Sequence, residues 1–165
     1  MKREGEQMAA FQGIIQPIWL KPSVQQELGK HLLTCYPHEA CGILLGAAAA
    51  GGMYIDTYVP MHNVAPDPLH AFVPDPREWV KALYRNPAPV GLFHSHPSAE
   101  PRPSAADLSG LASLGPSFDV YLIGSPNSSE DSPLRLNGYY IVREQAAAGR
   151  ERSSLREAPI YALLK

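Results

Sequence analysis

The chain has 165 residues, of which 45% are hydrophobic and 18% are charged, and its formal net charge is −2. This length accommodates one domain with a sizeable core and is short for two ordinary domains. The basic residues are scattered apart from a small group at 150–156, which argues against general binding to a nucleic-acid backbone, because such binding requires clustered Lys and Arg.

Cysteine use and the absence of targeting signals predict a cytoplasmic protein. Cys35 and Cys41 lack the C-x-x-C spacing, so they fit reduced thiols better than a disulfide framework. Residues 1–12 are polar, which predicts a flexible arm and not a signal peptide. No apolar stretch has the length of a membrane span, and we therefore expect neither a membrane nor a nucleic-acid partner.

The first predicted elements are a strand, a helix and a β-hairpin. Residues 13–20 are apolar enough for a strand, although Pro17 favours a place at the edge of a sheet. A helix is expected at 22–34, because apolar side chains recur there at helical spacing. Short apolar strands at 41–45 and 53–59 predict a hairpin, with a turn of small residues between them.

A proline-rich segment at 60–76 follows, and we expect an irregular surface loop with a brief strand near 70–73. A second helix is predicted at 75–84 with Asp75 as its N-cap. The apolar run at 90–96 predicts a central strand.

The last part of the chain continues the alternation of helix and strand. A third helix is expected at 104–114, and two further strands at 119–124 and 134–143. Residues 144–156 are predicted to form a low-complexity connection, and 159–163 a final edge strand. This alternation predicts an α/β fold, in which a mixed β-sheet is flanked by helices.

Two histidines end the predicted central strand. His94 and His96 are separated by one residue, so both side chains project from the same face of a strand. Pro97 cannot donate the next ladder hydrogen bond, which favours a strand end where a pocket can open. A lone histidine is more often structural, but this pair together with a carboxylate suits a zinc ion that keeps one position for water.

The next aspartate downstream is Asp107, three residues after Ser104. The same Ser-x-x-Asp spacing is typical of a helix capping box, so a capping role without any metal is the main alternative for both residues. The two interpretations are compatible, because a helix N-terminus facing the histidines directs Asp107 at a cation and the Ser104 hydroxyl into the same space.

Glu39 is the candidate proton acceptor, since a carboxylate near a metal-activated water takes its proton and returns it to the leaving amine. It lies at the start of an apolar strand, where a charge is costly unless a function requires it. A surface glutamate in a turn is the alternative. A cysteine protease that uses Cys41 and His94 is a further alternative, although nothing in the sequence marks Cys41 as a reactive thiol.

Together these residues resemble the signature of the JAMM (MPN-plus, Mov34/PAD-type) zinc metalloprotease family. Glu39 stands in a Glu-Ala-Cys-Gly strand start, and His94-Ser95-His96-Pro97 is followed after six residues by Ser104 and Asp107, which fills every position. The resemblance implies a mixed sandwich like that of cytidine deaminases.

The resemblance covers residues 13–143, which we expect to be a JAMM/MPN catalytic domain. It does not cover 144–165, which we expect to be a C-terminal connection with a possible edge strand. The compact chain is similar to the small stand-alone bacterial members, because 126–133 is too short to be the long insertion of some eukaryotic relatives.

The resemblance also implies a role for each residue. His94, His96 and Asp107 look like the zinc ligands, with a water in the fourth position. Glu39 looks like the general acid/base, and Ser104 like the donor that stabilises the oxyanion. The implied reaction is hydrolysis of an amide or isopeptide bond after the C-terminal tail of a ubiquitin-like protein.

Some small bacterial members process ubiquitin-like sulfur-carrier proteins, and we expect a substrate of that sort. Its extended tail would lie beside a sheet edge, with the loop at 60–76 as one wall and with His62, His70 and Phe72 placed to contact the partner. A non-catalytic MPN-type binding module with a structural metal is the alternative function. A homodimer remains an open alternative to a monomer.

Overall fold

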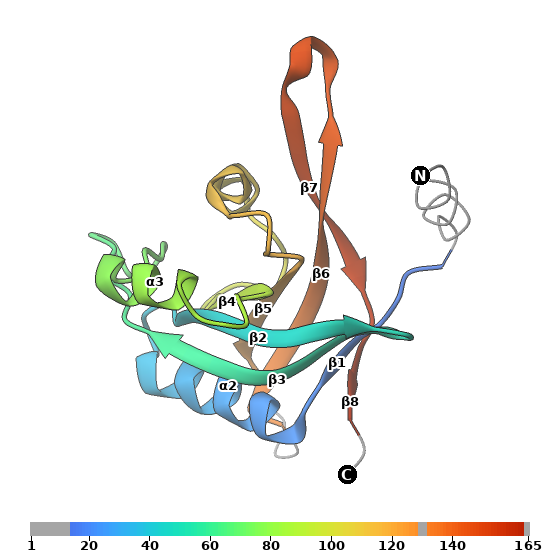
Figure 1. Cartoon of the computed structure of the whole chain (residues 1–165). Helices are drawn as coiled ribbons and strands as arrows, with labels where there is room; N and C mark the ends of the chain where they lie inside the picture. Colours follow the sequence, from blue (N-terminus) through green and yellow to red (C-terminus); the bar gives the residue numbers. More distant parts are fainter. Residues whose placement is uncertain (1–13, 129–131, 164–165) are drawn as a thin grey trace.

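A mixed sheet of eight strands forms the centre of the structure, a computed structural model that describes residues 14–128 and 132–163 (Figure 1). The arm predicted at 1–12 lies outside the described residues. The strands are β1 (Ile18–Leu20), β2 (Cys41–Ala49), β3 (Gly52–Met61), β4 (Gly91–Ser95), β5 (Val120–Pro126), β6 (Leu134–Gln145), β7 (Glu151–Ala158) and β8 (Ile160–Ala162). The helices are α2 (Pro22–Cys35), α3 (Pro76–Leu83) and α4 (Ala105–Gly110), with 3₁₀ turns at Leu111–Ser113 and Ala147–Gly149.

The strands follow the order β7-β6-β5-β4-β2-β3-β1-β8 across the sheet. β4 pairs in parallel with β5, and β1 pairs in parallel with both β3 and β8, whereas the other neighbours are antiparallel. The two edge strands, β7 and β8, are joined by Pro159 alone. The sheet therefore curls enough for one residue to connect its two edge strands, and the predicted fold class of a mixed sheet flanked by helices is confirmed.

The helices cover the two faces of the sheet and divide the core into two clusters (Figure 1). On one face, α2 buries Val24, Leu28 and Leu32 against the strands, as its helical spacing predicted. On the other face, α3 and the turn after α4 pack over the sheet through side chains such as Trp79 and Leu111. No helix in the described part of the chain has the length and apolarity that crossing a membrane would need.

The predicted hairpin is formed by β2 and β3, and both strands are longer than the sequence indicated. β2 runs on to Ala49, so the small residues expected in the turn extend the strand instead. The turn lies at Ala50 and Gly51, and the φ angles of 93° at Gly51 and 131° at Gly52, the first residue of β3, favour glycine. A Cβ on Gly52 would also lie 2.0 Å from the carbonyl oxygen of Pro17.

Three predictions about strands were wrong. β1 is not an edge strand, because Pro17 precedes it and leaves both of its sides free to pair. The segment at 144–156 is not a mere connection, because β7 pairs with β6 along its length and anchors Leu155 in the core. The brief strand near 70–73 does not form, and a single bridge joins Asn63 to Pro74 instead. The final edge strand is confirmed as β8.

β4 lies in the middle of the sheet between β2 and β5, and all of its side chains are buried. The helix predicted after the proline-rich loop is α3, and the Asp75 carboxylate caps it by accepting hydrogen bonds from the backbone of Arg77 and Glu78. α4 follows β4 after a loop of nine residues, 96–104. The start of α4 lies beside the end of β4, on one face of the sheet.

Candidate metal centre

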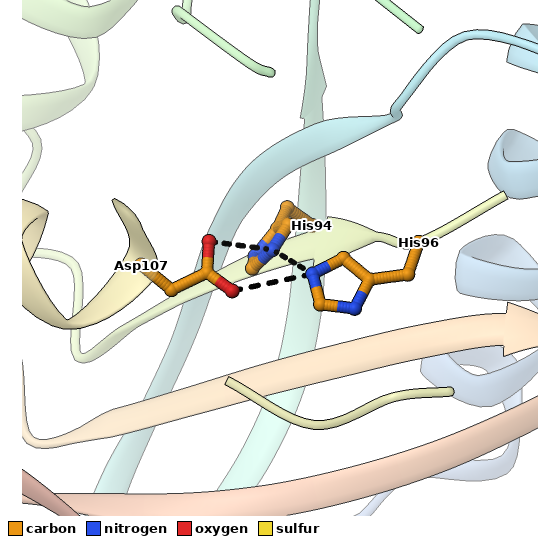
Figure 2. A group of neighbouring side chains, drawn as sticks. All are labelled: His94, His96 and Asp107. Carbon is orange, nitrogen blue, oxygen red and sulfur yellow. Dashed lines mark hydrogen bonds and ion pairs between the residues drawn. The ribbon is translucent and has the colours of Figure 1, made fainter. Parts of the chain in front are cut away.

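His94 and His96 lie at the end of β4 and point the same way, as the strand spacing predicted (Figure 2). Their Nε2 atoms are 3.0 Å apart. His94 is fully buried and His96 is 8% exposed. The intervening Ser95 points to the opposite face, where its hydroxyl accepts a hydrogen bond from the backbone N–H of Ala40 at 2.8 Å.

Asp107, in the first turn of α4, completes the cluster (Figure 2). Its Oδ1 lies 3.2 Å from Nε2 of His94, and its Oδ2 lies 3.2 Å from Nε2 of His96. Burial alone would raise the pKa of this carboxyl group, but the hydrogen bonds from the two imidazoles outweigh it and hold the pKa well below its usual range. Asp107 is therefore a carboxylate.

The capping box predicted at the start of α4 is present as well. The backbone N–H of Ser104 donates to Oδ2 of Asp107 at 2.8 Å, and the backbone N–H of Asp107 donates to the Ser104 hydroxyl at 3.1 Å. One carboxylate thus caps the helix and faces both histidines. The two interpretations of this residue coexist in the structure.

The second nitrogen of each imidazole shows which atom is available to a ligand. Nδ1 of His96 lies 2.8 Å from the carbonyl oxygen of Glu100 and can only donate to it, so Nε2 is the nitrogen that carries the lone pair when the ring is neutral. Nδ1 of His94 is buried without a hydrogen-bond partner in the described structure. The ring of His94 is stacked on Phe72 at 4.4 Å and packs edge-on against Tyr121 at 5.4 Å.

These three side chains could hold a metal ion. One ligand atom from each of His94, His96 and Asp107 lies within 4.8 Å of the other two, and all three residues are buried. Two imidazole nitrogens and a carboxylate oxygen form a donor set that suits a divalent transition metal. A carboxylate and two imidazoles buried this closely also gain from a cation between them, because each then has a partner for its lone pair.

Glu39 lies two residues before the start of β2 and is 7% exposed. Its backbone is held at both ends, since its N–H donates to the carbonyl of Pro68 at 2.8 Å and its carbonyl accepts from the side chain of Asn63 at 3.0 Å. Burial raises the pKa of Glu39 to about 7, although the nearby His96 has a lowering effect. The sequence alternative of a surface turn glutamate is wrong.

A cleft of about 610 Å³ brings the candidate residues together. Glu39, His96, Ser104 and Asp107 all line it, whereas His94 is buried beneath. The rest of the wall is largely apolar and comes from the loop before α3, from α3 itself and from the sheet. Side chains of this wall include Leu69, Phe72, Val73, Trp79, Leu114 and Tyr121.

Two of the three loop residues expected to contact a partner, His70 and Phe72, line this cleft. His62 instead pairs with Glu78 on α3, and is not part of the cleft lining in the described residues. The alternative nucleophile, Cys41, is fully buried, and burial raises its pKa to about 12. A cysteine protease centred on this thiol is therefore excluded.

Sequence reasoning assigned no role to Ser95 or Asn63, which hold the candidate site in place. Ser95 was visible inside the histidine run, and strand alternation placed it on the face opposite the histidines. Its bond to Ala40 fixes the start of β2, next to Glu39, against the end of β4. Asn63 is harder to find from the sequence, because Glu39, Ala71 and Val73, whose backbone groups it binds, are eight or more residues away.

Comparison with known proteins places this site in a family. Residues 21–152 match the family described as prokaryotic homologs of the JAB domain. The chain is 38% identical over 95 residues to a Haloferax volcanii protein named desampylase, across 55% of this chain and 65% of that protein. It is 28% identical over 102 residues to a Thermus thermophilus protein named a probable TtuB-protein conjugate cleaving protease, across 59% of this chain and 64% of that protein.

The chain thus matches less than two thirds of the length of either relative. A solution structure of a Desulfitobacterium hafniense protein is similar with a TM-score of 0.65 and 28% identity, and the match covers 90% of this chain and 94% of that one. The family match spans most of the described sheet and every candidate site residue. The chain therefore belongs to the prokaryotic JAB family, and the predicted membership of the JAMM-type proteins is confirmed.

Proposed function

We propose that this protein is a zinc metallopeptidase that hydrolyses the amide or isopeptide bond after the C-terminal tail of a ubiquitin-like protein. One observation carries the proposal. The buried cluster of His94, His96 and Asp107 borders the same cleft as the carboxyl group of Glu39 and the hydroxyl of Ser104. Ligands, a proton carrier and an oxyanion donor are thereby available to one bound substrate.

Zinc is the metal that this donor set favours, held by Nε2 of His94, Nε2 of His96 and a carboxylate oxygen of Asp107. When bound, zinc lowers the pKa of a coordinated water and polarises the scissile carbonyl. The residues around the ligands keep them in place. The Glu100 carbonyl sets the tautomer of His96, and the capping box fixes the carboxylate of Asp107.

Glu39 is proposed as the general acid/base. Its pKa of about 7 lets it accept a proton near neutral pH and later donate that proton to the leaving amine. Its burial next to β2 and its place in the cleft wall limit competition from bulk water. The bonds to its backbone N–H and carbonyl restrict where the carboxyl group can move.

Ser104 is proposed as the oxyanion donor. Its hydroxyl oxygen accepts the N–H of Asp107, so its own hydrogen is available to donate into the cleft. A hydroxyl held in this way points at developing negative charge without reorganising. The same helix start therefore supplies a metal ligand and an oxyanion donor.

The proposed substrate is a conjugate of a ubiquitin-like or sulfur-carrier protein. The names of the two relatives support this choice, because one is described as cleaving conjugates of a protein called TtuB and the other as a desampylase. The largely apolar cleft beside the candidate centre also suits a peptide tail. We place the protein in the cytoplasm, since both cysteines are free thiols, and we expect no nucleic-acid or membrane partner.

The alternative is a binding module that keeps the metal but does not cleave. Substitution Glu39→Gln separates the two functions, with Glu27→Gln on the exposed face of α2 as a matched control. The probe is a small ubiquitin-like protein ending in Gly-Gly, joined through its last carboxyl group to the lysine of a fluorescent peptide. We expect about one zinc per chain in all three proteins, and a loss of cleavage of about 100-fold or more in Glu39→Gln alone.

Two results would contradict the proposal. A wild-type protein that carries zinc and binds the probe without cleaving it would favour the binding module. A purified protein without metal, which gains none on incubation with zinc, would exclude both functions and favour the capping role of Ser104 and Asp107.

A further inference from the structure

The side-chain amide of Asn63 uses all of its hydrogen-bonding capacity on backbone groups. Its Nδ2 donates to the carbonyl of Glu39 at 3.0 Å and to the carbonyl of Ala71 at 2.9 Å. Its Oδ1 accepts from the N–H of Ala65 at 3.0 Å and from the N–H of Val73 at 3.0 Å. Two donors and two acceptors exhaust an asparagine side chain.

These four bonds link two walls of the cleft. Glu39 belongs to the chain that enters β2, whereas Ala71 and Val73 belong to the loop between β3 and α3. Between the last two lies Phe72, whose ring stacks on His94 at 4.4 Å. Asn63 therefore stands between the candidate acid/base and the segment that covers a candidate metal ligand.

The loop has little regular structure of its own to hold it. Two backbone bonds form the bridge from Asn63 to Pro74 and join the two arms of the loop, one from the N–H of Val64 to the carbonyl of Val73 at 2.8 Å and one from the N–H of Asp75 to the carbonyl of His62 at 2.9 Å. The Asn63 side chain forms hydrogen bonds with the backbone groups of Ala65, Ala71 and Val73 that a neighbouring strand would otherwise bind. The four bonds of the Asn63 side chain therefore add substantially to the few backbone bonds that hold this loop wall.

We infer that Asn63 is a positioning residue, which fixes the Glu39 backbone and the wall at 71–73 in one geometry. The inference rests on the proposed function for its kinetic consequence, but the contacts themselves do not. Loss of the two donated bonds frees the carbonyls of Glu39 and Ala71, and the bond from the Glu39 N–H to Pro68 alone then ties the backbone of Glu39 to the loop, at a point outside the wall at 71–73. A displacement of about 1 Å at a reacting group costs up to about 100-fold in rate.

Two substitutions test the Asn63 amide, one that removes its donor alone and one that removes all of its hydrogen bonds. Asn63→Asp is nearly isosteric and keeps an acceptor for Ala65 and Val73, but it replaces the donor to Glu39 and Ala71 with an oxygen. Asn63→Ala removes all four bonds. Tyr140→Phe is the matched control, because it removes one long-range bond, from the hydroxyl to the carbonyl of Pro17 at 3.1 Å, on a different part of the sheet.

The measurements are kcat and KM on the fluorescent ubiquitin-like conjugate, zinc content, melting temperature and hydrogen exchange of the peptide spanning 64–74. For Asn63→Asp we expect kcat to fall about 10- to 100-fold and KM to rise, with zinc content unchanged and melting lowered no more than in Tyr140→Phe. Exchange at 64–74 should be faster in both Asn63 variants, and unchanged in the control.

A purely structural asparagine would give another pattern. If kcat per folded molecule and KM stay at the wild-type values while only the melting temperature falls, the positioning role is wrong. Unchanged exchange at 64–74 in Asn63→Ala would overturn it as well. A wild-type protein that fails to cleave the conjugate refutes the proposed function, and the exchange measurement then still decides whether the amide holds the wall.

Discussion

The hydroxyl of Tyr139 donates to the backbone carbonyl of Pro101 at 3.1 Å, from β6 to the loop that joins β4 to α4. The side chain of Asn137 donates to the same carbonyl at 3.0 Å. On β5, the buried hydroxyl of Ser125 donates to the carbonyl of Ala99 at 2.6 Å. The carbonyl of Glu100 lies between these two and accepts the bond from the imidazole of His96. Three successive carbonyls of this loop are therefore held by side chains, and two of the three are held from the sheet.

We expect Ser125→Ala to weaken zinc binding about 10- to 100-fold, because the loop that orients His96 loses one of its attachments. Competition against a chelator of known affinity measures this change. The matched control is Thr34→Ala, which removes a hydroxyl bond to the carbonyl of Lys30 at 2.8 Å on the far helix. Equal zinc affinity in Ser125→Ala and the control would show that the attachment does not act on the ligand.

Asp107→Asn should remove metal binding and leave most of the helix cap. The amide oxygen can still accept the N–H of Ser104, so the cost in folding stability is about 1 kcal/mol or less. Zinc at 100 times its dissociation constant stabilises a binding protein by about 2.7 kcal/mol. We therefore expect zinc to raise the melting temperature of the wild type and not of the variant. A similar rise in both would remove Asp107 from the ligand set.

Thiol labelling should distinguish the two cysteines. Cys41 is fully buried and burial raises its pKa to about 12, whereas Cys35 is only half-buried. In native protein at pH 8, iodoacetamide should modify Cys35 first, and Cys41 should react only once the protein unfolds. Mass spectrometry of tryptic peptides checks the order. Rapid native labelling of Cys41 would contradict its burial beside β4.

Acid should destabilise the fold partly through His31. Burial lowers the pKa of His31 below its ordinary value, and the Tyr58 hydroxyl lies 2.7 Å from Nδ1, where it donates to a neutral ring. The unfolded chain then binds more protons just below pH 6.5, so this contribution to stability is present above that pH and declines as the pH falls.

Urea unfolding of the metal-free protein at pH 7.5 and pH 5.5 tests the effect of His31. His31→Gln should show a smaller loss of stability between the two pH values than the wild type. Equal losses would assign the acid sensitivity to other groups, including the histidines at the end of β4.

Much of the candidate site could be predicted because its signals are local. Strand alternation places His94 and His96 together, and the Ser104–Asp107 spacing predicts both the cap and the third ligand. The contacts that hold the site are not local. The bonds of Asn63 to Glu39, and of Tyr139 to the loop after β4, join residues whose side chains give no pattern in their own segments.

The errors in the fold have a similar cause. The composition of 144–156 indicates a connection, and only the pairing of Leu155 with Ile141 reveals a strand. Pro17 argues for a sheet edge, but it lies one residue outside β1 and breaks no ladder bond there. In both places, tertiary pairing outweighed a local propensity.

The closure of the sheet separates two stages of assembly. His94 and Asp107 come from one short stretch of chain, so the candidate metal centre requires contacts of low sequence separation. Ile18, by contrast, pairs with Ile160, and the curled sheet joins its edges only when these distant strands meet. Contacts between residues so far apart in the sequence slow folding, because the intervening chain must first lose conformational entropy. The three candidate ligands can therefore come together before β1 pairs with β8.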